Sequence, residues 1–116
     1  MMNYKAKIIA KAAMPYVSVL VFPDGSVKQL ATSKTPENAK ANFEKVLKKF
    51  FPVYPAKYTK PEHVEQTLAH FCMHKAEQKA MSVQEFENLK SAAPSPDYVE
   101  ICKNYYPEYY QQITNN

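Results

Sequence analysis

The stretch YVSVLVFPDGSVKQLA, residues 16–31, decides the fold of this chain. Residues 16–22 are rich in β-branched residues and are apolar on both faces, which is typical of a central strand. Pro23, Asp24 and Gly25 then supply the chemistry of a hairpin turn, in which Gly25 can take the positive φ that other residues avoid. Residues 27–31 form the returning strand. The stretch therefore predicts an antiparallel hairpin.

The residues before this hairpin alternate between apolar and polar side chains. Over residues 4–12, Tyr4 and Ile8 point to one side while the lysines point to the other, which is the period of a half-buried strand. Pro15 separates this strand from the next, because proline lacks the amide donor that a sheet requires. We expect residues 4–12, 16–22 and 27–31 to form a three-stranded antiparallel β-meander at the N-terminus.

The hairpin is followed by the signature of an amphipathic helix. Thr35 is a good N-cap, and Pro36 suits the first helical position. Apolar residues then recur at helical spacing, namely Ala39, Phe43, Val46, Leu47 and Phe50. Lys45, Lys48 and Lys49 fall on the opposite face. We expect this helix to pack on the sheet through its apolar stripe.

The remainder of the chain predicts three more helices. The expected fold is therefore of the α+β class, with a three-stranded sheet and about four helices. Residues 51–61 contain three prolines and form an extended connection. A second helix is expected from Pro61 to about Ala80. A third begins at the capping box of residues 82–85, and a last one begins at residues 95–96. Pro107 should kink or end that last helix.

The length of 116 residues suits one domain, spanning residues 1–116. We divide it into a basic half (1–50), a proline- and aromatic-rich connection (51–61) and an acidic helical half (62–116). Residues 1–60 hold eleven Lys and three acidic residues, whereas residues 61–116 hold four Lys and eight acidic residues. This asymmetry favours an acidic partner for the N-terminal half, although lysine is also the default solubilising residue of a chain without arginine.

Two absences exclude classes of function. The single glycine excludes phosphate-binding loops and dinucleotide-binding turns, which need several glycines. The lack of arginine counts against bidentate recognition of phosphate or guanine, and it suggests an AT-rich coding sequence of the kind found in phages and mobile elements.

The sequence shows no signal peptide and no apolar run of about 20 residues, so we expect a cytoplasmic protein with no membrane association and no cofactor.

Three histidines lie on the polar face of the expected second helix. His70 and His74 are four residues apart, a spacing that lets two imidazoles share a metal ion, and Glu77 follows one turn later. His63 is too far along the helix to complete such a site. A metal- or pH-responsive helix is therefore one hypothesis, with a solvated face or a partner contact as its alternatives.

The sequence shows no catalytic constellation. Cys72 lies on the side of its helix opposite His74, so these two side chains cannot form a nucleophile and its base. Cys72 and Cys102 are instead expected to be small buried hydrophobic residues with free thiols, a disulfide being the minority alternative. We expect a protein that is not an enzyme.

Two surfaces are candidates for binding a partner. The first is the lysine face of the first expected strand, formed by Lys5, Lys7 and Lys11, with Lys28 added from the third. The second is the tyrosine-rich C-terminal segment, with Tyr105, Tyr106, Tyr109 and Tyr110. A single narrow helical stripe cannot bury tyrosines at this spacing, so some of them should form either an interface or a broad packing surface.

The leading hypothesis is a small protein-binding module, such as a phage- or mobile-element-type inhibitor or adaptor. The alternative is an accessory nucleic-acid-binding protein that uses contacts between lysine and phosphate. The third is the metal- or pH-responsive helix of His70 and His74. An open edge on the first strand would also permit homo-oligomers to form.

Overall fold

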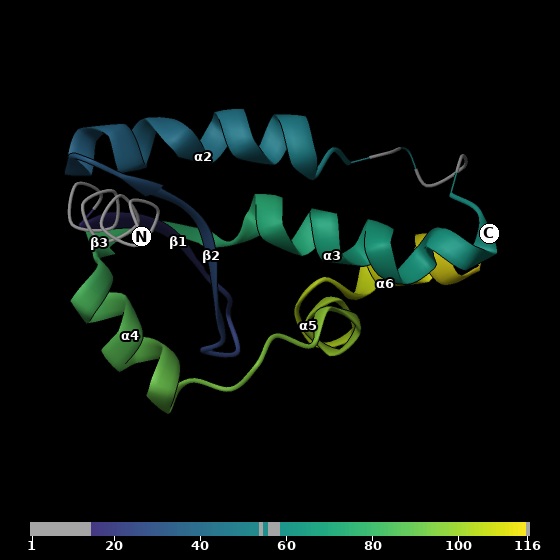
Figure 1. The fold of residues 1–116 in the computed structure, drawn as a ribbon. Coiled ribbons are helices and arrows are strands. Elements are labelled where there is room, and N and C mark those ends of the chain that lie inside the picture. The colour runs from purple at the N-terminus through teal and green to yellow at the C-terminus, as the bar shows by residue number, and fades with distance from the viewer. Residues whose placement is uncertain (1–14, 54, 56–58, 116) are drawn as a thin grey trace, which may run out of the picture.

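The computed structural model describes residues 15–53, 55 and 59–115, and it confirms the α+β class (Figure 1). Its sheet has three antiparallel strands in the order β2-β1-β3. The strands are β1 (Tyr16–Val21), β2 (Val27–Ser33) and β3 (Glu77–Ser82). The expected strand over residues 4–12 lies outside the described residues.

The hairpin between β1 and β2 has the turn that the sequence predicts. Gly25 takes a φ of 89°, the left-handed conformation in which a Cβ would be strained. Its amide donates to the carbonyl of Phe22 across 2.9 Å. The Asp24 carboxylate accepts hydrogen bonds from the backbone amide of Ser26 at 2.9 Å and from its hydroxyl at 2.5 Å. Proline, aspartate and glycine thus close a three-residue loop that fixes the strand register.

The first helix that the sequence predicts, α2 (Pro36–Phe50), packs on the sheet as expected. The Thr35 side chain accepts a hydrogen bond from the amide of Asn38 at 3.1 Å, so the predicted cap is confirmed. The Ser18 hydroxyl of β1 donates to the carbonyl of Ala39 in α2. Phe50 differs from the expectation, because it is 60% exposed at the end of the helix rather than part of the buried stripe.

The second expected helix is shorter than the sequence suggests. Helix α3 (Val64–Lys75) stops five residues before Ala80, and the chain then forms β3 along the free edge of β1. Residues 77–82 carry no large apolar side chain except Met81, so they have little to hold them in a helix. The exposed hydrogen-bonding groups of β1 offer a full ladder instead, and this tertiary pairing overrides the local helical preference.

The structure has five α-helices and one short 3-10 helix among the described residues. They are α2, η2 (Pro61–His63), α3, α4 (Val83–Ala92), α5 (Tyr98–Tyr105) and α6 (Pro107–Thr114). Ser82 caps α4 as predicted, whereas Asp97 caps α5, two residues beyond the expected start. Pro107 ends α5 and begins α6, which raises the number of helices from about four to five.

Within the described part of the chain, no helix combines the length and the apolar character that crossing a membrane requires.

Alternate residues of β1 enter two separate cores. Val17 and Val19 face α4, where they pack with Phe86. Leu20 of β1 and Phe22, which follows this strand, belong to the other core, together with residues of α2, α3, α5 and α6. Helices α3, α5 and α6 lie together beside the sheet (Figure 1). The larger core therefore joins the sheet to the C-terminal helices, and it contains Leu20, Phe22, Phe43, Leu47, Leu68, Cys72, Met73, Ala76, Ile101, Cys102 and Ile113.

Candidate functional site

The break between α5 and α6 places two tyrosines beside α3. Tyr106 sits in the break with a non-helical backbone (φ −133°, ψ 56°), and Pro107 then starts α6 in a new direction. Tyr106 meets the ring of Phe71 edge-on, at 5.5 Å and 82°. Tyr109 stacks on Phe71, at 3.7 Å and 13°. Phe71 is therefore the point on α3 at which both tyrosines converge.

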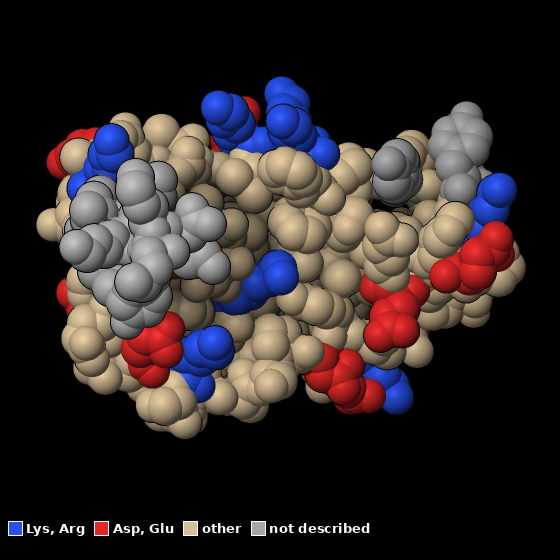
Figure 2. Space-filling model, viewed as in Figure 1, with Lys and Arg blue, Asp and Glu red and all other residues tan. Residues whose placement is uncertain are grey.

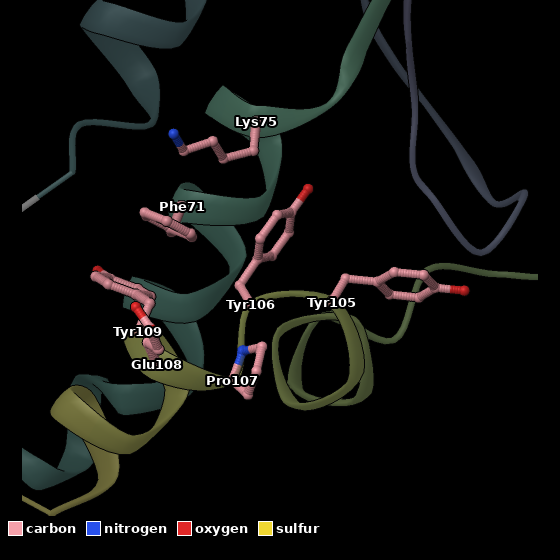
Figure 3. A pocket seen from close by; sticks show the side chains of 7 residues that line it. All are labelled: Phe71, Lys75, Tyr105, Tyr106, Pro107, Glu108 and Tyr109. Atoms are coloured by element: carbon pink, nitrogen blue, oxygen red, sulfur yellow. The ribbon is translucent and has the colours of Figure 1, made fainter.

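These aromatic rings line a pocket of about 380 Å³ (Figure 3). Its walls are formed by Phe71, Lys75, Tyr106, Pro107, Glu108 and Tyr109. Tyr105 stands at the rim, and its ring points away from the other lining side chains (Figure 3). Pockets of this kind, mostly apolar with a few polar groups at fixed positions, are typical of binding sites.

A second, smaller pocket continues the first toward the sheet. It measures about 230 Å³ and is also lined by Lys75 and Tyr106, which both pockets share. Its other walls come from the hairpin side of the molecule and from the start of β3, including Pro23 and Glu77. We call the two pockets together the aromatic groove. The groove therefore runs from α6, past Lys75, to the turn between β1 and β2.

Lys75 is the cationic group at the centre of the groove. Its Nζ atom lies 5.6 Å from the centre of the Phe71 ring, a cation–π distance. Among the described residues the only ion pair joins Lys79 to Glu77, so Lys75 has no carboxylate partner there. An anionic group entering the groove would find this ammonium group unpaired.

Burial keeps the tyrosines of this region neutral. Burial is the main cause that raises the pKa of Tyr106, and Cys72 and then Cys102 add to it. Burial is also the main cause that raises the pKa of Tyr109, where Cys102 and then Cys72 add to it. Tyr98 of α5 also has a raised pKa, because of burial and then Cys72. These hydroxyls therefore stay protonated to a higher pH than an exposed tyrosine hydroxyl does.

The four predicted tyrosines have different surroundings. Tyr105 is exposed, whereas Tyr106, Tyr109 and Tyr110 are half-buried and pack against the larger core. Tyr106 and Tyr109 therefore serve the packing surface and the groove together. Tyr110 is not part of the groove lining.

The predicted lysine face can be examined only at one residue. Lys5, Lys7 and Lys11 lie outside the described residues. Lys28 is half-buried on β2, and its Nζ atom lies 5.6 Å from the centre of the Phe51 ring. Lys28 therefore covers the residue that follows α2.

His70 and His74 of the expected polar face both contact the connection after α2, although His74 itself remains exposed. His70 is buried, and its Nδ1 lies 2.7 Å from the carbonyl oxygen of Pro52. The Nε2 of His74 lies 2.7 Å from the carbonyl oxygen of Phe51. A carbonyl oxygen only accepts, so the Nδ1 of His70 and the Nε2 of His74 each carry the hydrogen of the bond.

The third residue of the metal hypothesis lies elsewhere. Glu77 is on β3, because α3 has already ended, and its carboxylate lies 3.8 Å from Nζ of Lys79. Within the described part of the chain, no group of three or more His, Cys, Asp or Glu side chains is placed to hold a metal ion. The geometry of His70 and His74 thus supports a structural role for both.

Two groove residues were not singled out by the sequence. Phe71 was expected only as part of the apolar face of the second helix, and Lys75 was one of four lysines in the acidic half. A Phe and a Lys four residues apart share one face of a helix, which was the available signal. Their meeting with Tyr106, about thirty residues later, depends on the tertiary packing of α3 against α5 and α6.

Comparisons of the chain with models of known protein families, with curated proteins and with solved structures found no match.

Proposed function

We propose that this chain is a protein-binding module, acting as an adaptor or inhibitor, that holds an extended segment of a partner protein in the aromatic groove. The observation that carries the proposal is Lys75, which lines two pockets with aromatic walls and has no carboxylate partner among the described residues. Tyrosine rings give a large contact area at a low cost in side-chain entropy, which is why they are frequent in protein interfaces.

The shape of the groove favours an extended peptide over a compact ligand. Its two pockets have Lys75 and Tyr106 as common lining residues. In an extended chain, alternate side chains point to the same side, so two side chains of one segment can enter two neighbouring pockets. Apolar or proline residues suit the ring faces of Phe71 and Tyr106, because aromatic-lined grooves recognise proline-rich segments in this way.

Charge gives the segment a second requirement. Lys75 favours a carboxylate on the bound peptide, since it has no acidic partner among the described residues. Glu108 lines the first pocket and Glu77 the second. These two carboxylates repel every anion, so the groove favours a peptide whose single acidic side chain reaches Lys75 over a nucleic acid that carries a phosphate on every nucleotide.

A displayed library of random decapeptides, selected on the immobilised protein, tests the proposal. We expect the enriched peptides to share an acidic residue close to proline or aromatic residues. Synthetic copies should shift the backbone amide NMR signals of Phe71, Lys75 and Tyr106. Lys75→Glu should weaken their binding at least about tenfold, because like charges face each other in the complex.

Lys49→Glu is the matched control for that variant. Lys49 is also exposed and also lies over a phenylalanine ring, with its Nζ atom 5.3 Å from the centre of Phe50, but it is on α2 and outside the groove. Its replacement should leave peptide binding unchanged. Failure to enrich any peptide, or equal loss of binding in both variants, would argue against the groove.

A second candidate function is nucleic-acid binding through the outward face of α2. Lysine side chains gather over this helix (Figure 2). Lys45, Lys48 and Lys49 are exposed there, and none of them has an ion pair among the described residues. This candidate predicts binding of labelled DNA or RNA that falls steeply with salt, and a shallower salt dependence after each lysine is replaced by glutamine. Fluorescence anisotropy that stays flat at low salt would exclude it.

A further inference from the structure

The sulfur atoms of Cys72 and Cys102 lie 2.8 Å apart in the centre of the larger core. Cys72 is on α3 and Cys102 is on α5, thirty residues later. Both side chains are 0% exposed. A disulfide bond has a sulfur–sulfur distance of about 2.05 Å, so a movement of less than about 1 Å would bring these atoms to bonding distance.

The surroundings hold the two thiols against each other. The Cys72 thiol lies 3.6 Å from the carbonyl oxygen of Tyr98, and the Cys102 thiol lies 3.4 Å from the carbonyl oxygen of Leu68. Each cysteine is thus also anchored to the backbone of the other's helix. Because α3 and α5 pack closely over this region, neither side chain has room to turn away.

We propose that Cys72 and Cys102 are a site of oxidative modification, at which a small-molecule disulfide such as glutathione disulfide converts the two thiols into an intramolecular disulfide between α3 and α5. Nothing in this proposal depends on the aromatic groove or on its ligand.

The reaction proceeds by two exchanges. One cysteine thiolate attacks a sulfur of glutathione disulfide, forming a mixed disulfide and releasing one glutathione thiolate. The second cysteine, as its thiolate, then attacks the protein sulfur of that mixed disulfide and releases the other glutathione. The two protein thiols are oxidised, the glutathione disulfide is reduced to two glutathione molecules, and the two protons pass to the released thiolates.

The two thiols share one hydrogen bond, in which either sulfur can be the donor. This bond lowers the pKa of Cys102, and the same bond, followed by burial, raises the pKa of Cys72. Because the two thiols titrate together, either one can supply the attacking thiolate. Since both side chains are fully buried, glutathione disulfide reaches them while the chain folds or when α5 separates from α3.

The test is an equilibrium titration of the full chain in glutathione redox buffers, once in native buffer and once in concentrated urea. The reaction is quenched with acid and the free thiols are alkylated. Mass spectrometry then measures the fraction of chain that carries no alkyl group, has lost two hydrogen atoms relative to the unalkylated reduced chain, and yields a Cys72–Cys102 cross-linked peptide. At half oxidation, the squared concentration of glutathione divided by the concentration of glutathione disulfide gives the effective concentration of the thiol pair. In the chain-entropy model, closing a loop of thirty residues predicts a value about 10² to 10³ times higher in native buffer than in urea.

The oxidised protein should also melt roughly 10 °C or more above the reduced protein. Equal effective concentrations in native buffer and in urea would overturn the proposal, as would a native protein that stops at the mixed disulfide with glutathione. Cys72→Ala is the control, because it leaves Cys102 without a partner and allows only the mixed disulfide. These readouts need no peptide ligand, so they are independent of any failure of the proposed binding function.

Discussion

The imidazole of His70 donates from Nδ1 to the carbonyl oxygen of Pro52 across 2.7 Å. This bond ties the middle of α3 to the chain that follows α2. The ring of His70 also meets the ring of Phe51 edge-on, at 5.5 Å and 81°. A side chain that first suggested a metal ligand therefore joins α3 to the segment that follows α2.

Replacing His70 with alanine should lower the free energy of unfolding by about 1–3 kcal/mol, because the variant loses a buried hydrogen bond and an aromatic contact. Urea unfolding followed by circular dichroism measures the change. His63→Ala is the control, since His63 is exposed and should cost less than about 0.5 kcal/mol. Equal effects of the two substitutions would contradict the structural role of His70.

The hydroxyl of Ser18 connects the central strand to α2 through the carbonyl of Ala39. Ser18 is 0% exposed, so Ser18→Ala should destabilise the protein by about 1–2 kcal/mol in urea unfolding. Thr114 makes the same kind of bond to the carbonyl of Tyr110, at 2.8 Å, but on the exposed surface of α6. Thr114→Val should change the stability by less than about 0.5 kcal/mol. A Ser18→Ala protein as stable as the parent would show that the bond to α2 contributes nothing net.

Tyr109 carries a buried hydroxyl that has no hydrogen-bond partner among the described residues. Burying an unpaired polar group is costly, so Tyr109→Phe should raise the stability by up to about 1 kcal/mol while keeping the ring stacked on Phe71. Thermal melting of the purified variants measures this gain. Tyr105→Phe, at an exposed position, should leave the melting temperature unchanged. A clear loss of stability in Tyr109→Phe would mean that the hydroxyl has a partner in solution.

Stability should decline at alkaline pH. Burial raises the pKa of Tyr98 in the folded state, whereas an unfolded tyrosine titrates near pH 10. The unfolded chain therefore binds fewer protons above about pH 10, so the stabilisation is complete below that pH and is lost as the pH rises toward the folded pKa. Urea unfolding at pH 8, 10 and 11 should show a steeper decline for the parent protein than for Tyr98→Phe. Parallel curves would contradict the raised pKa, because the other titrating groups are common to both proteins.

Much of the N-terminal architecture could be read directly from the chain. The hairpin turn, the Thr35 cap and the capping box at Ser82 are local signals, since each depends on residues within three or four positions. Glycine at the positive φ, and hydroxyl groups that accept from the third amide of a helix, act in the same way in any surrounding fold. Helix α5 begins two residues later than expected, because Asp97 and not Ser95 accepts the hydrogen bond from the third amide of the helix.

The groove could not be read in this way. Tyr106 and Tyr109 were candidates from their number and spacing, but their companions Phe71 and Lys75 come from another helix. The break at Pro107 was expected, yet the direction of α6 after it depends on packing against α3. Nor did the sequence show that Cys72 contacts Cys102. Each cysteine lies on the apolar side of its own helix, but this pattern does not determine which residues of α3 and α5 contact each other.

By itself, the sequence determined the elements whose cause is local: the β1–β2 hairpin, the amphipathic helix α2 and the points at which proline or a polar cap begins a helix. Tertiary structure alone decided that residues 77–82 leave the expected helix and pair with β1. It also decided that His70 and His74 contact the chain after α2. It brings Cys72 to Cys102 in the core, and Phe71 and Lys75 to Tyr106 and Tyr109 in the groove. The physical reason is that a strand edge, a buried imidazole and a pocket wall gain their stability from partners distant in the sequence, and no local pattern encodes which partner arrives.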